Sequence, residues 1–226
     1  CEALAVPVIS GNVSFYNETR GTAIFPTPTV AVVGLLDDWE KHAVSHFPRE
    51  GLDVVLLGET REDVGGSEWL ALRRGLEAGV PPRVDLEHEK RLHRLLADGV
   101  RAGAIASAHD VANGGLAVAL AECCFAGRDV CVGAEVELAE PFRPDAVLFG
   151  ESTGRVVVGT ASAEALLALA AKHGVPAVRI GTTGGTRLVV RSAGSGETWI
   201  DRDVDALRTT WERAIPRRLA SSGEPR

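Results

Sequence analysis

The spacing of hydrophobic and polar positions changes near residue 50. Up to residue 36 the apolar residues form short extended runs. The clearest is 29–36, after a weaker run at 21–25, and such runs predict strands. A polar, irregular stretch over 37–51 follows, where we place a domain boundary. Residues 1–36 are therefore expected to form a hairpin-like end of a sheet domain.

From residue 51 onward, strand patterns and helix patterns alternate. Strands are predicted at 53–58, 104–108, 130–138, 156–158, 177–181, 187–190 and 198–200, and helices after Ser67 and at 86–103, 116–125, 144–148, 163–173 and 204–219. The helix at 86–103 is expected to be the longest, and the glycine-rich stretch 181–185 is expected to be a hairpin turn. This order favours an α/β (α+β) fold, with helices packed against one mixed sheet.

Capping residues predict where two helices begin, and the composition of the last residues predicts a disordered end. Ser67 and Asp203 each precede an apolar helical pattern and are expected to be N-caps. Residues 221–226 are polar and terminal, and we expect them to be disordered.

Composition excludes several classes of function. The 226 residues carry a net charge of −7 with no basic block, so nucleic acid or an anionic membrane is not expected as a partner. No apolar run is long enough to span a bilayer. The cysteines (Cys1, Cys123, Cys124, Cys131) show neither metal spacing nor a disulfide framework. The adjacent pair suggests buried reduced thiols, which are typical of the cytoplasm.

The first residues already have the pattern of the middle of a strand–loop unit. The chain begins with Cys1 and contains no methionine. We therefore expect a piece of a longer polypeptide, whose N-terminal portion carries part of the chemistry.

Polar residues gather directly after the first apolar run. Two serines, two asparagines, a threonine, a glutamate and a glycine fall within 10–19. Amides, hydroxyls and backbone N–H groups at the end of a strand can bind a phosphate or a hydrated cation. A polar turn between two strands is the alternative.

Two further polar clusters lie beside glycines. In the first, Asp110 can bind Mg²⁺ or cap the helix that follows, and His109 can be a general base or a hydrogen-bonded structural residue. The second, 150–155, joins a glutamate, two hydroxyls and an arginine. It can contact a phosphorylated or polyol ligand, or form a tight turn with a surface ion pair.

Other common signatures are missing from the sequence. It contains no Walker A lysine loop, no G-x-G-x-x-G after a strand, no H-E-x-x-H and no G-x-S-x-G. His88 and His93 lie five positions apart and are expected to be surface residues rather than ligands.

Three stretches taken in order carry a family resemblance. PVISGNVSFYNET (7–19), AHDVANGGLAVALAE (108–122) and FGESTGRVVV (149–158), with GGSEWL (65–70), resemble phosphoribosylformylglycinamidine synthase. More narrowly, they resemble the second half of its large synthetase subunit of the small bacterial type. That family is similar to aminoimidazole ribonucleotide (AIR) synthetase and selenophosphate synthetase, all of which use ATP.

The resemblance implies a domain division. Residues 1–36 would be the end of the second repeat's AIR-synthase-related N-terminal domain, with the nucleotide and metal motif. Residues 46–194 would be the AIR-synthase-like C-terminal domain, 195–220 a C-terminal extension with a helix, and 221–226 the disordered tail.

The resemblance also implies an activity. It is the ATP-dependent conversion of formylglycinamide ribonucleotide to formylglycinamidine ribonucleotide in purine biosynthesis, with ammonia from glutamine. The implied cofactors are ATP and Mg²⁺. The implied partners are the ribonucleotide substrate, a glutaminase subunit, a small accessory subunit and the missing N-terminal portion of the chain, all in the cytoplasm.

By position in the motifs, Gly11 corresponds to an ATP contact, Asn12 to a magnesium ligand and Ser14 to a substrate contact. The family's catalytic residues belong to the first repeat and have no counterpart in this chain. Two alternatives remain: a non-catalytic scaffold or assembly module, and another ATP enzyme of the same superfamily.

Other positions match first-repeat residues with less specificity. Asp110 corresponds to a metal ligand, and Glu151 with Ser152 to substrate contacts, although in a second repeat they can also line a vestigial site. Thr153 stands where glutamine is common, and Asn113 where an acidic residue is common. These departures argue against activity of this piece alone.

Overall fold

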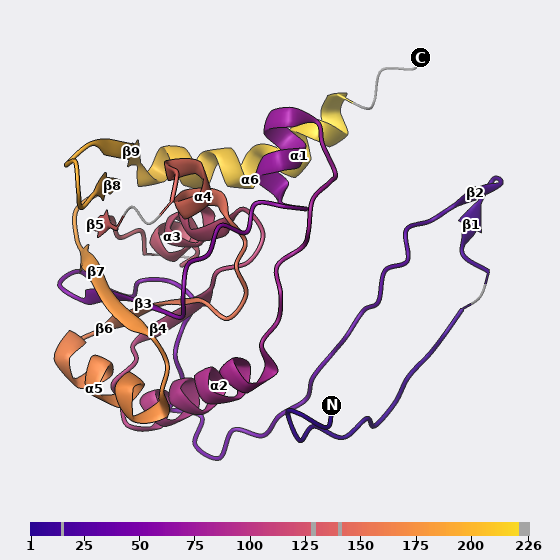
Figure 1. Cartoon of the computed structure of the whole chain (residues 1–226). Helices are drawn as coiled ribbons and strands as arrows, with labels where there is room; N and C mark the ends of the chain where they lie inside the picture. Colours follow the sequence, from indigo (N-terminus) through magenta and orange to yellow (C-terminus); the bar gives the residue numbers. More distant parts are fainter. Residues whose placement is uncertain (15, 128–129, 140–141, 222–226) are drawn as a thin grey trace. The chain divides into compact units, whose positions relative to one another are not determined.

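A computed structural model describes the whole chain apart from residues 15, 128–129, 140–141 and 222–226 (Figure 1). It divides into two compact units, Cys1–Glu40 and Lys41–Arg226. In the described residues, no helix combines the length and apolar character that crossing a membrane requires.

The first unit contains one small hairpin in an otherwise extended chain. Its strands, β1 (Glu18–Thr19) and β2 (Thr22–Ala23), pair antiparallel. The strand predicted at 29–36 is wrong, because these residues pair with no strand in the described part of the chain. An apolar run becomes a strand only where a neighbouring backbone completes its hydrogen bonds.

The second unit is built on a seven-stranded mixed sheet. The order across the sheet is β4-β6-β3-β7-β5-β8-β9. All neighbours are antiparallel except β5 and β8. The strands are β3 (Asp53–Leu57), β4 (Ser107–Asp110), β5 (Ala134–Leu138), β6 (Val156–Thr160), β7 (Ala177–Thr183), β8 (Arg187–Ser192) and β9 (Thr198–Asp203).

In the described part of the chain, six helices accompany the sheet. They are α1 (Glu68–Arg74), α2 (Leu86–Arg101), α3 (Gly115–Phe125), α4 (Pro144–Phe149), α5 (Ala163–His173) and α6 (Val204–Ser221). α6 has 18 residues and α2 has 16, so the expectation that α2 is the longest is wrong. Ser221 ends α6, and the rest of the predicted disordered tail lies outside the described residues.

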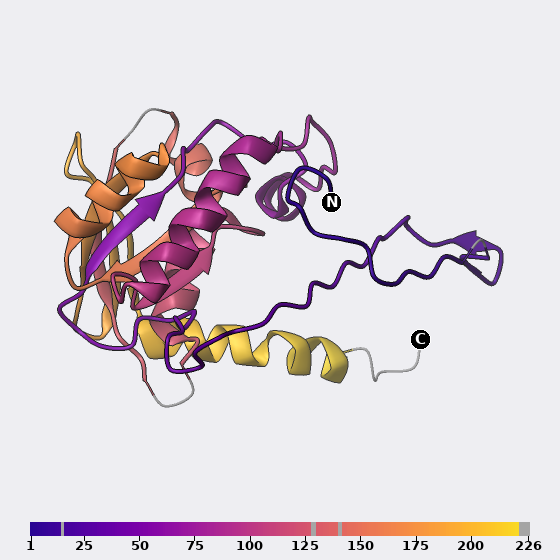
Figure 2. The same cartoon turned by 90° about the horizontal axis from the view of Figure 1, so that it is seen from below.

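Helices cover both faces of the sheet (Figures 1 and 2). Val54 and Leu56 of β3 belong to one core with α3 and α4, whereas Val55 and Leu57 belong to another with α2 and α5. Successive side chains of a strand point to opposite faces, so a strand buried on both faces needs an unbroken apolar run. This confirms the mixed α/β sheet packed by helices.

The hairpin expected at 181–185 is also wrong. β7 and β8 are not neighbours, because β5 lies between them and pairs with both. The glycine-rich stretch therefore connects two strands across a third. Gly181 also allows close strand approach, since a Cβ there would lie 2.0 Å from the carbonyl oxygen of Glu135.

Candidate functional site

The sheet brings together the polar cluster around Asp110 and the polar cluster at 150–155. β4 and β6 pair with Asp110 opposite Val156, so the end of β4 meets the loop before β6. A cavity of about 510 Å³ opens there, beside α2. Its polar and charged lining is Glu89, His93, Asp110, Asn113, Glu151, Thr153 and Arg155. Sequence reasoning found the two clusters but did not predict that they share one wall.

Asp110 ends β4 itself rather than following it. Its side chain is 79% exposed, with Oδ1 3.9 Å from Nδ1 of His109. The capping interpretation is wrong, because α3 has Gly114 at its N-cap and no side-chain cap. In the described residues, no three His, Cys, Asp or Glu side chains are placed to hold one metal ion. Asp110 can therefore supply one oxygen ligand but not a complete site.

His109 is a hydrogen-bonded structural residue. Its Nδ1 donates to the backbone oxygen of Asp110 at 2.8 Å, which places the other ring nitrogen toward Glu122. The distance from Nε2 to Oε2 of Glu122 is 3.4 Å, and the side chain is only 16% exposed. The packing therefore favours the structural alternative over the general base.

The carboxylate of Glu151 faces backbone amides. Its Oε1 accepts the N–H of Gly114 at 2.8 Å and the N–H of Glu68 at 3.0 Å. Ser152 is fully buried, and its Oγ accepts from the backbone N–H of Arg61 and donates to the carbonyl of the same residue. Their substrate roles remain predictions, but the present hydrogen bonds are structural.

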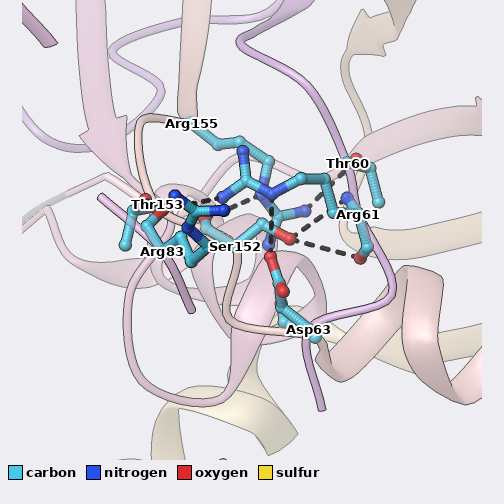
Figure 3. Close-up of polar contacts among 8 residues, drawn as sticks. Thr60, Arg61, Asp63, Arg83, Ser152, Thr153 and Arg155 are labelled. Carbon is cyan, nitrogen blue, oxygen red and sulfur yellow. Dashed lines mark hydrogen bonds and ion pairs between the residues drawn. The ribbon is translucent and has the colours of Figure 1, made fainter. Parts of the chain in front are cut away.

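Arg155 is buried rather than part of a surface ion pair (Figure 3). Its guanidinium donates to the carbonyls of Gly150 and Ser152 and to the hydroxyl of Thr60. Burial, and secondly the charge of Arg61, lowers its pKa to about 10. The tight-turn interpretation of 150–155 fits this geometry, and the surface ion pair does not.

Sequence reasoning missed the residues that hold this turn from outside. The carbonyl of Arg83 accepts from Arg61 Nη2 at 3.2 Å and from the hydroxyl of Thr153 at 2.9 Å. Nε2 of His88 lies 2.9 Å from the carbonyl of Gly154, so His88 is not simply a surface residue. No signal pointed to Arg83, since its backbone does the binding.

Gly11, Asn12 and Ser14 lie in the first unit and are exposed. A Cβ at Gly11 would meet nothing within 4 Å, and the carbonyl of Ser14 accepts from Nδ2 of Asn17 at 2.6 Å. The described residues of this unit do not enclose a ligand around these three positions. Their assignments stay predictions.

The cysteines of α3 take no part in the candidate site. Cys123 and Cys124 are buried and free, as expected. Burial raises the pKa of Cys124 to about 12. A thiol that stays protonated is a poor nucleophile and a poor metal ligand.

The architecture of the second unit defines a class: a mixed α/β domain with helices on both sheet faces. A family model described as AIR synthase related protein, C-terminal domain, matches residues 49–192. The match covers more than half of the chain. The chain therefore belongs to the family of AIR synthase related proteins.

Relatives extend the similarity over nearly the whole chain. The phosphoribosylformylglycinamidine synthase subunit PurL of Moorella thermoacetica is 48% identical over 218 residues, covering 96% of this chain and 29% of the relative. That of Thermobifida fusca is 47% identical over 222 residues, covering 96% and 28%. The chain thus spans less than a third of the length of these curated relatives.

Solved structures confirm the fold. Thermotoga maritima PurL complexed with FGAR has a TM-score of 0.64 at 24% identity, covering 75% of this chain and 30% of that one. The same protein complexed with ATP has a TM-score of 0.58 at 23% identity, covering 75% and 27%.

Proposed function

We propose that the chain is part of an ATP-dependent amidoligase of purine biosynthesis. The enzyme would convert formylglycinamide ribonucleotide to formylglycinamidine ribonucleotide with ammonia from glutamine. The observation that carries the proposal is the 48% identity to the Moorella thermoacetica synthase subunit across 96% of this chain. The complexes of the Thermotoga maritima protein with FGAR and with ATP name the ligands we propose.

Three residues of the first unit would contribute to the ligand site. Gly11 presents backbone without a side chain, which suits a close ATP contact. Asn12 offers an amide oxygen for Mg²⁺, and the Ser14 hydroxyl can donate to a substrate phosphate. All three are exposed and available to a ligand. Because the described residues contain no complete metal-ligand set, Asn12 and Asp110 are proposed only as single ligands.

We place the chain in the cytoplasm, with a glutaminase subunit and a small accessory subunit as partners of the longer enzyme. The buried free thiols of α3 suit a reducing compartment. Residues 1–36 are proposed to end an N-terminal sheet domain and 46–194 to form the C-terminal domain, followed by the extension at 195–220.

A chimera tests the function. The 226 residues would replace the matching segment of the Moorella thermoacetica subunit, and ATP- and ammonia-dependent amidine formation would be measured. We expect turnover in the chimera and a loss of about 100-fold or more in Asn12→Ala, because metal-held phosphoryl groups dominate such catalysis. The matched control is Thr29→Ala, an exposed polar residue of the same unit. Normal kinetics in Asn12→Ala would refute the site assignment, and a folded but inactive chimera would refute the function.

One observation favours a second candidate, a non-catalytic assembly module. Glu151 and Ser152 already satisfy their hydrogen bonds with backbone groups, as expected for a site that no longer binds a ligand. Calorimetric titration of the chain with Mg-ATP and with the ribonucleotide separates the two. Binding of neither would favour the assembly module for this piece.

A further inference from the structure

Glu151 is the point at which three distant segments of the second unit meet. A single carboxylate oxygen accepts the N–H groups of Gly114 and Glu68. The backbone N–H of Glu151 donates to the carbonyl of Asp63 at 2.9 Å. Because two backbone N–H groups donate to this one oxygen, the Glu151 side chain links the start of α1 to the start of α3.

Arg155 fixes the backbone on both sides of Glu151. Its guanidinium donates to the carbonyl of Gly150 at 2.6 Å and to that of Ser152 at 3.1 Å, the residues directly before and after Glu151. The Arg155 side chain is 1% exposed, so moving this turn would leave buried donors and acceptors without partners, at a large cost. The backbone that carries Glu151 is thus held in one place.

α1 is a short helix at the surface of the second unit. None of its residues is buried. The segments before and after α1 are joined by a hydrogen bond from the N–H of Gly66 to the carbonyl of Ala78 at 2.9 Å. Trp69 stacks on Phe149, with ring centroids 4.4 Å apart. Ser67 caps the helix by accepting the N–H of Leu70, and the Glu151 bond ties the first residue of the helix, Glu68, to the turn before β6.

Gly114, the other partner of Glu151, lies next to the lining of the cavity beside α2. Gly114 follows Asn113, which lines the cavity together with Asp110. α3 has no side-chain cap of its own, and the N–H of its N-cap residue, Gly114, donates to Glu151 in the loop before β6. The placement of Asn113 and Gly114 therefore depends on Glu151, whereas Asp110 is held by the pairing of β4 with β6.

We propose that Glu151 is a positioning residue, which holds the Asn113–Gly114 part of the cavity wall and ties it to the first residue of α1 by accepting two backbone hydrogen bonds. The relevance of that wall to turnover rests on the proposed function; the positioning itself does not. This role needs an acceptor oxygen rather than a negative charge. A substrate or metal contact would need the charge.

Glu151→Gln and Glu151→Ala separate the two roles, because glutamine keeps an acceptor oxygen and loses the charge. In the 226-residue chain, amide exchange would be measured in peptides covering Glu68 and Gly114. We expect Glu151→Ala to exchange about tenfold faster in both peptides, and Glu151→Gln to stay within about threefold of the original. Glu164→Gln, an exposed glutamate of α5, is the matched control. Unchanged exchange in Glu151→Ala would overturn the proposal.

Turnover of the chimera gives the second readout. Glu151→Gln is expected to retain activity within about threefold, whereas Glu151→Ala loses about tenfold or more. Equal losses in both variants, with intact exchange protection in Glu151→Gln, would mean that the charge contacts a ligand and would overturn the positioning role. An inactive parent chimera would instead count against the proposed function, and the exchange result would still decide the positioning.

Discussion

Asp53 begins β3, and its carboxylate joins two other elements to that strand. Oδ1 accepts from Nε of Arg179 on β7 at 2.7 Å, and Oδ2 accepts the N–H of Ala163 at the start of α5 at 3.0 Å. The bond from Arg179, followed by the bond from Ala163, lowers the pKa of Asp53 in the folded state. A carboxylate with a lowered folded-state pKa adds stability above its unfolded pKa. That stability is lost as the pH falls through the folded value.

Asp53→Asn should therefore change how stability depends on pH. We expect the variant to be less stable than the original at pH 7, with the difference shrinking below about pH 4, where the unfolded carboxyl titrates. Urea unfolding at pH 7, 5 and 3 measures this. Asp205→Asn, at an exposed position of α6, is the control for the loss of one carboxylate. A constant difference across this pH range would contradict the assignment.

Other single residues show which contacts a sequence can predict. Ser67 caps α1 by accepting the N–H of Leu70, and Asp203 accepts the N–H of Ala206, both as predicted. In each case donor and acceptor lie three residues apart, so the pattern is local. The partner of Ser152 is Arg61, 91 positions away. The spacing of residues along the sequence cannot indicate such a distant partner. For this reason Glu151 and Ser152, whose side chains bind backbone groups in the structure, were predicted to bind a ligand.

At the scale of elements, the start of α3 depends on a close backbone approach. Gly115 has φ of +70°, and a Cβ there would lie 2.7 Å from the carbonyl oxygen of Gly150. The helix therefore lies directly against the turn that carries Glu151. The apolar periodicity predicted the helix α3, but it did not predict that the backbone of Gly150 lies against Gly115.

Gly115→Ala and Gly103→Ala form a matched pair that isolates this contact. Gly103 has nearly the same φ, +69°, and a Cβ added there would meet nothing within 4 Å. Gly103→Ala should cost about 1 kcal/mol for the left-handed backbone. Gly115→Ala should cost about 2 kcal/mol more, because backbone must also move. Urea unfolding of both variants measures the difference, and equal costs would show that the approach is not tight.

At the scale of the whole molecule, the two units differ in how they bury apolar side chains. In the second unit, residues 54–57 of β3 are buried, and Val55 has no exposed surface. In the first unit, Val30, Val32 and Leu35 are 82%, 73% and 98% exposed. The sheet class was predictable because both faces of β3 need apolar side chains. Strand order was not, because it depends on pairings between distant segments.

Residues 29–36 of the first unit form an exposed, extended apolar run that pairs with no strand in the described part of the chain. We propose that 29–36 pairs within a larger sheet of the longer protein, since unpaired apolar edges otherwise promote association. Val32→Asp and Val55→Asp test this as a matched pair. In the 226-residue chain, Val32→Asp should change the free energy of unfolding by less than about 0.5 kcal/mol, whereas Val55→Asp should cost about 4 kcal/mol or more. In the chimera with the Moorella thermoacetica subunit, Val32→Asp should become strongly destabilising, because the charge would then enter a covered sheet. Thermal unfolding of both backgrounds distinguishes the outcomes, and a harmless Val32→Asp in the chimera would contradict the pairing.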